Sequence, residues 1–199
     1  MPRAFSTSVV FPCAFAQAAT AVWFKYPNPF AEHVQSIDVL NRTICPHTGV
    51  LRTERIMTVE QSTPKWIKQI LGIDGATYVR EVITVDPHVP AVRMDSTNLS
   101  YSEYLLVKEN IQYLPVDAEG AQHTRFDQAA DIDCHGLTKD SDRGLGLLAR
   151  AGRGVEDASY ARFRENAGRG RSGFAHVLAM LYGSATEPPK EQYEPKVVG

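Results

Sequence analysis

The chain has 199 residues, of which 43% are hydrophobic and 22% are charged, so it can bury one substantial core. Its formal net charge of −2 gives no global electrostatic case for binding nucleic acid. The three cysteines are far apart and form no CxxC pair, so the sequence indicates neither a disulfide framework nor a metal site.

The first residues, MPRAFSTSVVFPCAFAQAA, allow two interpretations. Arg3, a short apolar stretch and small residues after it imitate a secretory signal. We favour a first strand over STSVVF, because Pro12 breaks an apolar run that is already short. A helix is then expected over AFAQAATAVWFKY, ending at YPNP, since a residue before proline is pushed out of helical geometry. No run approaches the roughly 18 apolar residues of a membrane span, so we expect any membrane contact to be peripheral.

Strand candidates follow, rich in β-branched or aromatic residues and separated by short turn-like segments. They are HVQSIDVLNRTI, VLRTERIMTV, TYVREVITVD, PAVRMDSTNL, YLLVKENIQYL and QHTRFDQAADIDC. In the last of them Phe126, Ala130 and Ile132 alternate with charged residues, which is typical of a sheet with one buried face. Short connections between successive strands predict an antiparallel meander.

Residues 61–72, QSTPKWIKQILG, interrupt the series of strands. On a helix, the apolar side chains of this segment share one arc and its lysines lie on the opposite arc. One interpretation is a connecting helix folded onto the core, and the other is an apolar lid that meets a membrane or covers a ligand. The residues that would form this lid or membrane contact are Pro64, Lys65, Trp66, Ile67, Lys68, Ile70, Leu71 and Gly72.

From about residue 139 the pattern changes to helix, most clearly from VEDASYARFRENA to FAHVLAMLYG. A long helix after a meander can bury its apolar face on the concave side of the sheet, and a curved sheet that grips a helix often leaves a cavity. The proline-rich, charged tail is predicted to be disordered. We therefore expect one domain over residues 1–182 and a disordered tail over 183–199.

Two observations point away from common enzyme classes. Gly168, Gly170 and Gly173 have the spacing of a dinucleotide fingerprint, but that fingerprint needs a preceding strand and these glycines lie in a helical stretch. The sequence has no GxSxG, HExxH or CxxCH motif, and its histidines are scattered. We therefore expect neither nucleotide binding nor a nucleophilic or metal enzyme.

Arg55 is a charge at a position where the strand pattern expects a buried side chain, on the same face as Thr53 and Met57. A buried charge is costly unless it is paired. Its partner could be a carboxylate, Glu81 or Asp38, or an anionic ligand, since the planar guanidinium fits phosphate oxygens well.

Arg162, Asn166 and Arg169 follow one another at i, i+4 and i+7 on the last helix. They form either a solvated face or, together with Arg55, a phosphate site at the mouth of a cavity. The late segment between Lys139 and Arg171 has more basic than acidic residues, which favours an anion at this place.

Several segments in this order resemble the PRELI family of mitochondrial intermembrane-space lipid transfer proteins, over about residues 1–182. They are YPNPF, HVQSIDVLNR, TERIMTV, PKWIKQILG, TYVREVITVD, STNLS and VEDASYARFRENA. The resemblance implies an α+β fold, in which a seven-stranded antiparallel sheet grips a long C-terminal helix around a lipid cavity, similar to phosphatidylinositol transfer proteins. It also implies a lid loop where QSTPKWIKQILG lies.

The function implied by the resemblance is that of a carrier without catalytic activity or cofactor, which moves one glycerophospholipid between mitochondrial membranes. The segments PKWIKQILG and TYVREVITVD are more similar to the slowmo-like members, which carry phosphatidylserine, than to the phosphatidic acid carriers. Phosphatidylserine is therefore the favoured lipid and phosphatidic acid the alternative. The competing class is an enzyme on the same helix-grip scaffold that uses His33 and a nearby carboxylate.

The resemblance also implies a set of basic and polar headgroup-binding residues. These are Lys25, His33, Arg55, Arg162, Asn166 and Arg169. It further implies a heterodimer with a small twin-Cys-x9-Cys partner in the intermembrane space and peripheral contact with acidic membranes.

Replacing Trp66, Ile67, Ile70 and Leu71 together with serine is expected to abolish lipid transfer while the fold stays intact. Their segregation on one arc suits contact with a bilayer or lipid and is unnecessary for joining two strands. Transfer between vesicles and circular dichroism, measured on the same preparations, test this expectation. Normal transfer with native spectra would identify the segment as a simple connecting helix.

Overall fold

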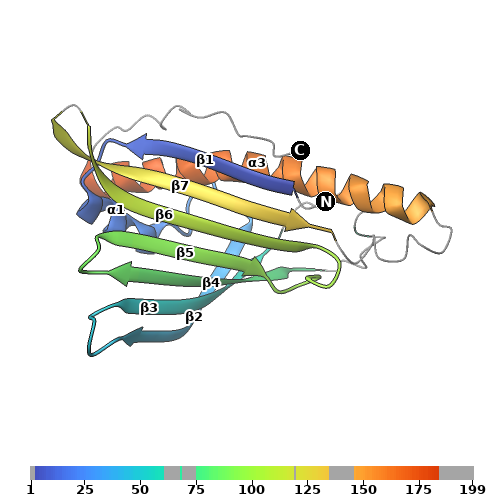
Figure 1. Cartoon of the computed structure of the whole chain (residues 1–199), viewed down its shortest axis with the longest axis horizontal. Helices are drawn as coiled ribbons and strands as arrows, with labels where there is room; N and C mark the ends of the chain where they lie inside the picture. The colour runs from blue at the N-terminus through green and yellow to red at the C-terminus, as the bar shows by residue number, and fades with distance from the viewer. Residues whose placement is uncertain (1–2, 61–67, 69–74, 119, 135–145, 184–199) are drawn as a thin grey trace.

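The structure is a computed structural model (Figure 1). It describes residues 3–60, 68, 75–118, 120–134 and 146–183, and only the backbone at 118 and 146–153. The expected lid at 61–72, apart from the exposed Lys68, and the expected disordered tail beyond residue 183 lie outside this part of the chain.

Seven strands form one antiparallel sheet in the order β1-β7-β6-β5-β4-β3-β2. They are β1 (Arg3–Phe11), β2 (Val34–Ile44), β3 (Leu51–Val59), β4 (Thr77–Asp86), β5 (Ala91–Asn98), β6 (Leu106–Ala118) and β7 (Ala121–Asp133). From β2 to β7 each strand pairs with the one that follows it in the chain, which confirms the predicted meander. The first strand, β1, pairs with the last, β7.

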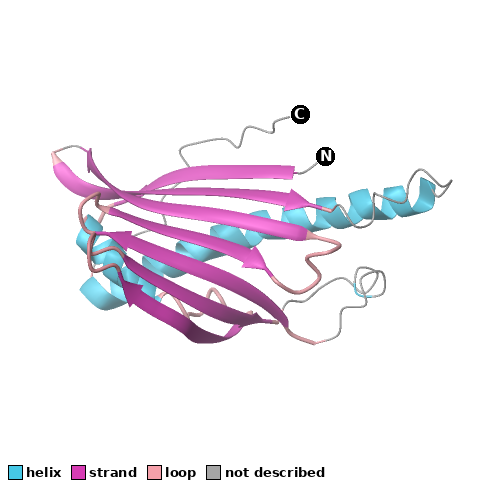
Figure 2. Cartoon of the chain, turned by 60° about the horizontal axis from the view of Figure 1, so that its bottom comes forward, coloured by secondary structure: helices cyan, strands magenta, loops and turns pink. Residues whose placement is uncertain are grey.

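The helices are α1 (Phe15–Ala21), the short 3-10 helix η1 (Val22–Phe24) and α3 (Gly146–Tyr182). The 37-residue α3 lies across one face of the sheet, and α1 lies beside its C-terminal part (Figures 1 and 2). The predicted seven-stranded antiparallel α+β fold with a long C-terminal helix is therefore confirmed. No helix of the described residues is long and apolar enough to cross a bilayer.

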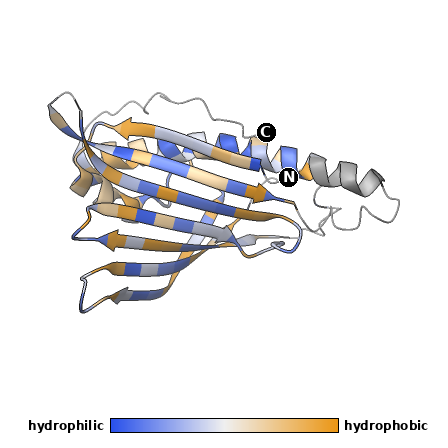
Figure 3. Ribbon diagram, in the orientation of Figure 1, coloured by the Kyte–Doolittle hydropathy of each residue, from blue (hydrophilic) through white to orange (hydrophobic). Residues whose placement is uncertain are grey.

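The main core lies where the C-terminal part of α3 meets the sheet. Buried and more exposed residues alternate along β1, β3 and β7, and apolar and polar residues are interspersed along the strands (Figure 3), so one face of the sheet is available to the helix. Phe174 on α3 packs edge-on against Phe11 of β1, with ring centroids 5.1 Å apart, and 4.9 Å from the ring of Tyr113 on β6. Val177 and Leu178 follow one turn later and are buried in the same cluster.

A second, smaller contact holds α3 closer to its N-terminus. Phe163 packs against Phe5 of β1 at 5.3 Å between ring centroids. A third contact lies about two turns earlier, where the buried Val155 packs against Cys134, just after β7.

The glycines that imitate a dinucleotide fingerprint lie inside α3, as expected, and Gly173 has a packing role. A Cβ atom at this position would lie only 2.7 Å from Oδ1 of Asn28. That oxygen accepts a hydrogen bond from the amide of Phe30 at 2.8 Å, and Nδ2 of Asn28 donates to the Lys25 carbonyl at 2.5 Å. Gly173 therefore lets the turn around Asn28 approach the helix closely.

Gly173→Ala is expected to destabilise the protein by about 1–2 kcal/mol, because Asn28 must shift and lose a hydrogen bond. Gly168→Ala is the matched control, since its Cβ would meet only Nη2 of Arg171, at 3.8 Å. The control should gain up to about 1 kcal/mol from the higher helix propensity of alanine. Chemical denaturation measures both, and equal effects would contradict the packing role of Gly173.

Candidate functional site

A cavity of about 340 Å³ lies between the sheet and α3. The lining comes from strands β3 to β7, the first residue of β2, the segment between η1 and β2, and the part of α3 from Ala158 to Arg171. Much of this lining is apolar and includes Val34, Met57, Val59, Val79, Val107, Ile111, Phe126 and Phe163. The cavity therefore begins where the packing of Phe174 and its neighbours ends, under the same helix.

Two acidic side chains reach into this cavity from the sheet, Glu81 on β4 and Glu109 on β6. Glu81 is 2% exposed. The side chain of Gln128 on β7 donates a hydrogen bond from Nε2 to Oε1 of Glu109 at 2.5 Å, which fixes the direction of that carboxyl group. Lys25, only 7% exposed, adds an ammonium group from the end of η1.

The ionisable groups influence one another across the cavity. Burial alone would lower the pKa of Lys25, but the neighbouring Tyr26, Tyr113, Glu109 and Glu81 outweigh it, and the pKa lies well above its usual value. Burial raises the pKa of Glu109, although Lys25 and the hydrogen bond from Gln128 oppose this change. The lysine is therefore charged at neutral pH inside a largely apolar site.

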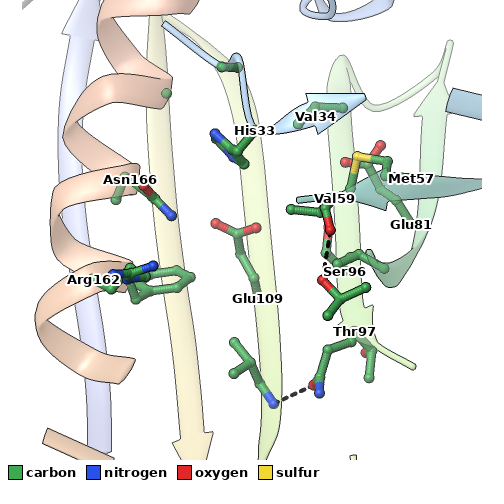
Figure 4. Close-up of a pocket in the computed structure, with 18 of the residues that line it drawn as sticks. His33, Val34, Met57, Val59, Glu81, Ser96, Thr97, Glu109, Arg162 and Asn166 are labelled. Atoms are coloured by element: carbon green, nitrogen blue, oxygen red, sulfur yellow. Dashed lines mark hydrogen bonds between the residues drawn. The ribbon is translucent and has the colours of Figure 1, made fainter. Parts of the chain in front are cut away.

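Four of the six predicted headgroup residues line the cavity, namely Lys25, His33, Arg162 and Asn166. Arg162 and Asn166 project from successive turns of α3 toward the strands, and Glu109 reaches up between them and the opposite wall (Figure 4). Arg169 is exposed and is not part of the lining. Burial lowers the pKa of His33 first, and the charges of Arg169 and Lys25 lower it further, so the imidazole is neutral at pH 7.

Arg55 stands apart from this group. It is buried, does not line the cavity, and its Nε lies 2.5 Å from Oε1 of Glu81, which is directly opposite on β4. Glu81 is thus the carboxylate partner that the strand pattern suggested, rather than Asp38. Within the described part of the chain, Nη2 of Arg55 has no hydrogen-bond partner.

The sequence pattern did not select Glu109, Gln128 or Arg171, which also line the cavity. Glu109 carries the signal that drew attention to Arg55, because it shares a strand face with Val107 and Ile111 and is a charge among apolar residues. Arg171 lies off the 162, 166, 169 spacing, so helical periodicity gives no signal for it.

Arg55→Glu is expected to destabilise the protein by about 3–5 kcal/mol, because it leaves two carboxylates buried side by side. The exchanged pair, Arg55→Glu with Glu81→Arg, should recover most of this loss. Urea denaturation of the two variants and the parent measures both values. If the exchanged pair is no more stable than the single variant, the ion pair is not what keeps Arg55 in place.

Comparison with known proteins gives consistent relatives. The sequence profile of the PRELI-like family matches residues 16–184. The protein UPS2, mitochondrial, of Saccharomyces cerevisiae is 37% identical over 179 residues, covering 90% of this chain and 74% of that protein. The slowmo homolog of Dictyostelium discoideum is 31% identical, over 87% of this chain and 70% of the relative. Human PRELI domain-containing protein 1, mitochondrial, is 25% identical, over 93% of this chain and 79% of that protein.

Solved structures agree on the fold. The Zhui aromatase/cyclase from a Streptomyces species superposes with a TM-score of 0.56 at 9% identity, over 91% of this chain and 96% of the enzyme. A protein from Thermus thermophilus superposes with a TM-score of 0.54 at 11% identity, over 90% of this chain and 99% of that protein. At such low identity the likeness concerns the helix-grip fold alone. The family profile and the sequence relatives, in contrast, cover most of the chain, and the chain belongs to the PRELI-like family.

Proposed function

We propose that this protein carries one glycerophospholipid, with phosphatidylserine favoured, between mitochondrial membranes in the intermembrane space. The observation that carries the proposal is the cavity under α3, which combines an apolar wall with Lys25, His33, Arg162 and Asn166. The family membership and the mitochondrial names of the relatives support the same function and location.

The apolar wall addresses the main obstacle to lipid transfer. Each buried methylene stabilises a lipid in its bilayer by about 0.8 kcal/mol, so a lipid with two long chains leaves the bilayer very slowly. Side chains such as Val59, Val107 and Phe163 offer an apolar surface in place of the bilayer. A protein of this kind lowers the cost of extraction and has no need of bond chemistry.

The polar part of the lining suits a phosphate group. Lys25 and Arg162 carry positive charge in surroundings where water screens charge poorly, and Asn166 adds an amide donor. His33 is neutral and can donate a hydrogen bond without adding charge. Arg169 is the exposed member of the proposed headgroup set, and its charge acts on His33. Arg55 contributes through its pair with Glu81.

The two carboxyl groups in the lining bear on the choice of lipid. Glu81 and Glu109 would disfavour a headgroup that carries negative charge alone. Phosphatidylserine also carries an ammonium group, for which a carboxylate is a natural partner, whereas phosphatidic acid has none. Phosphatidylserine is therefore the preferred ligand and phosphatidic acid the alternative.

An enzyme on this scaffold is the competing class, since a fold neighbour is an aromatase/cyclase. Its candidate base, His33, has no hydrogen bond or ion pair to a carboxylate among the described residues, so no acidic group orients the imidazole. This arrangement favours a carrier. Conversion of a bound ligand, which a carrier does not perform, discriminates the two classes.

The proposal includes two further contacts. A small twin-Cys-x9-Cys protein would form a heterodimer with the carrier and stabilise it by binding only the folded state. The residues of QSTPKWIKQILG would touch acidic membranes peripherally, with Lys65 and Lys68 beside anionic lipid headgroups. Exposed Lys68 is the described member of this segment.

Native mass spectrometry of the protein purified from cells tests the central proposal. A carrier should retain one intact phospholipid, whose mass also identifies the headgroup. An empty protein would contradict lipid carriage, and a chemically altered ligand would favour the enzyme.

Gly170→Leu is expected to reduce lipid binding and transfer by about tenfold or more, since forcing extra atoms into an occupied space costs about 1–3 kcal/mol. Gly170 lines the cavity, and its added Cβ would meet no other atom within 4 Å, so the larger side chain should enter open space without unfolding the helix. Gly168→Leu, on the same helix but outside the lining, is the matched control. Thermal melting and vesicle-to-vesicle transfer are the measurements. Equal transfer by both variants would show that this part of the cavity is not needed for lipid transfer.

A further inference from the structure

Exposed apolar side chains gather where the start of β4 meets the turn between β5 and β6. Tyr78 is 47% exposed, Leu99 44% and Tyr104 37%. The amide of Leu99 donates a hydrogen bond to the carbonyl of Tyr78 at 2.8 Å, so these two residues are neighbours. Single exposed apolar residues are ordinary on a protein surface, but a group of them indicates an interaction site. We call Tyr78, Leu99 and Tyr104 the apolar rim.

The apolar rim borders the cavity. Both sequence neighbours of Tyr78 line the cavity, and so do both neighbours of Leu99. Because side chains alternate along a strand, Tyr78 of β4 points to the opposite side of the sheet from Thr77 and Val79. Leu99 follows β5 and is exposed, and it is absent from the lining to which its neighbours Asn98 and Ser100 belong. Leu105, which follows Tyr104, also belongs to the lining. The same short segments therefore present polar and apolar groups to the cavity and apolar groups to the outside.

The turn that carries the rim is held by hydrogen bonds. The side chain of Asn98 donates to the carbonyls of Ser100 and Leu105 at 2.9 and 2.8 Å and accepts from the amide of Val107 at 2.7 Å. Tyr101 adopts a left-handed backbone conformation, with φ of 60°, which is uncommon for a residue other than glycine. The rim residues are thus displayed at fixed positions beside the cavity.

We propose that the apolar rim is a membrane-docking surface, which enters the interfacial layer of a phospholipid bilayer while lipid is exchanged. This inference rests on the proposed function, because a carrier must bring its cavity against the membrane. Tyrosine suits the interface, since its ring is apolar and its hydroxyl can stay in contact with water, and leucine favours the acyl chains.

The contact is apolar in character. The turn from Leu99 to Leu105 carries a single charged residue, Glu103, so attraction to acidic lipid contributes little here. Binding through the rim should therefore change little between low and high salt, because salt screens charges and leaves apolar burial intact. This distinguishes the rim from any contact made by basic residues.

Val89 provides a control within the same hairpin. It is 59% exposed in the turn between β4 and β5, which lies at the opposite end of these strands from Tyr78, and it does not line the cavity. If surface hydrophobicity alone causes membrane contact, Val89 and the rim should contact vesicles equally. If the rim is a docking surface, only the rim should contact them.

The experiment compares Tyr78→Trp with Val89→Trp in the full chain, each against the unaltered protein to subtract Trp23 and Trp66. Vesicles of phosphatidylcholine, with and without phosphatidylserine, are added at low and high salt. The emission of Tyr78→Trp should shift to shorter wavelength and be quenched by brominated acyl chains, and that of Val89→Trp should not change. No change at Tyr78→Trp, or the same change at both positions, would overturn the proposal, as would a shift seen only with a protein partner.

A second comparison covers affinity. Tyr78→Ser with Leu99→Ser should weaken vesicle binding by about tenfold or more, since two apolar side chains that would enter the bilayer are lost, while Val89→Ser leaves it unchanged. Thermal melting and the retained lipid, by native mass spectrometry, show that fold and cavity persist. Vesicle binding can be measured without lipid transfer. A protein that binds vesicles through the rim but holds no phospholipid would therefore contradict the proposed function and still support the docking role of the rim.

Discussion

The packing of α3 against the sheet at Phe174 is the contact on which the cavity depends. Phe174 meets rings from β1 and β6, and the residues one turn later continue the same core. A helix held firmly at this end can span the sheet with its preceding turns, which smaller contacts at Phe163 and Val155 support. The space that remains beneath these turns is the candidate site, so the same element supplies both the core and the roof of the cavity.

The ionic groups in the cavity wall follow from that arrangement. A cavity under a helix is shielded from water, so each charge there needs a counter-charge. Arg55 forms an ion pair with Glu81, whereas Lys25 and Glu109 shift each other's pKa without an ion pair between them. Charges that are balanced but not all in contact leave room for a ligand with charges of its own.

Composition and periodicity were sufficient to predict the meander, because strands such as β3 and β7 alternate along their length and the other strands are rich in β-branched residues. The β1–β7 pairing is a long-range contact that local pattern does not contain. The beginning of α3 at Gly146 was also beyond the pattern, since its glycine-rich start, GLLARAGRG, has low helix propensity. In the site, a misplaced charge selected Arg55 and could have selected Glu109, but only the packed structure separates the residue that lines the cavity from the one that supports it.

The pairing of β1 with β7 also has a consequence for how the protein reaches its fold. Val9 lies opposite Phe126, so the first strand made must wait for the last strand before its hydrogen bonds can form. Contacts between such distant residues slow folding, and an unpaired strand edge is open to association with other chains in the meantime. A chain that arrives in its compartment N-terminus first would therefore hold β1 unpaired until nearly all of its length has entered, and the vulnerable period ends only when β7 is available.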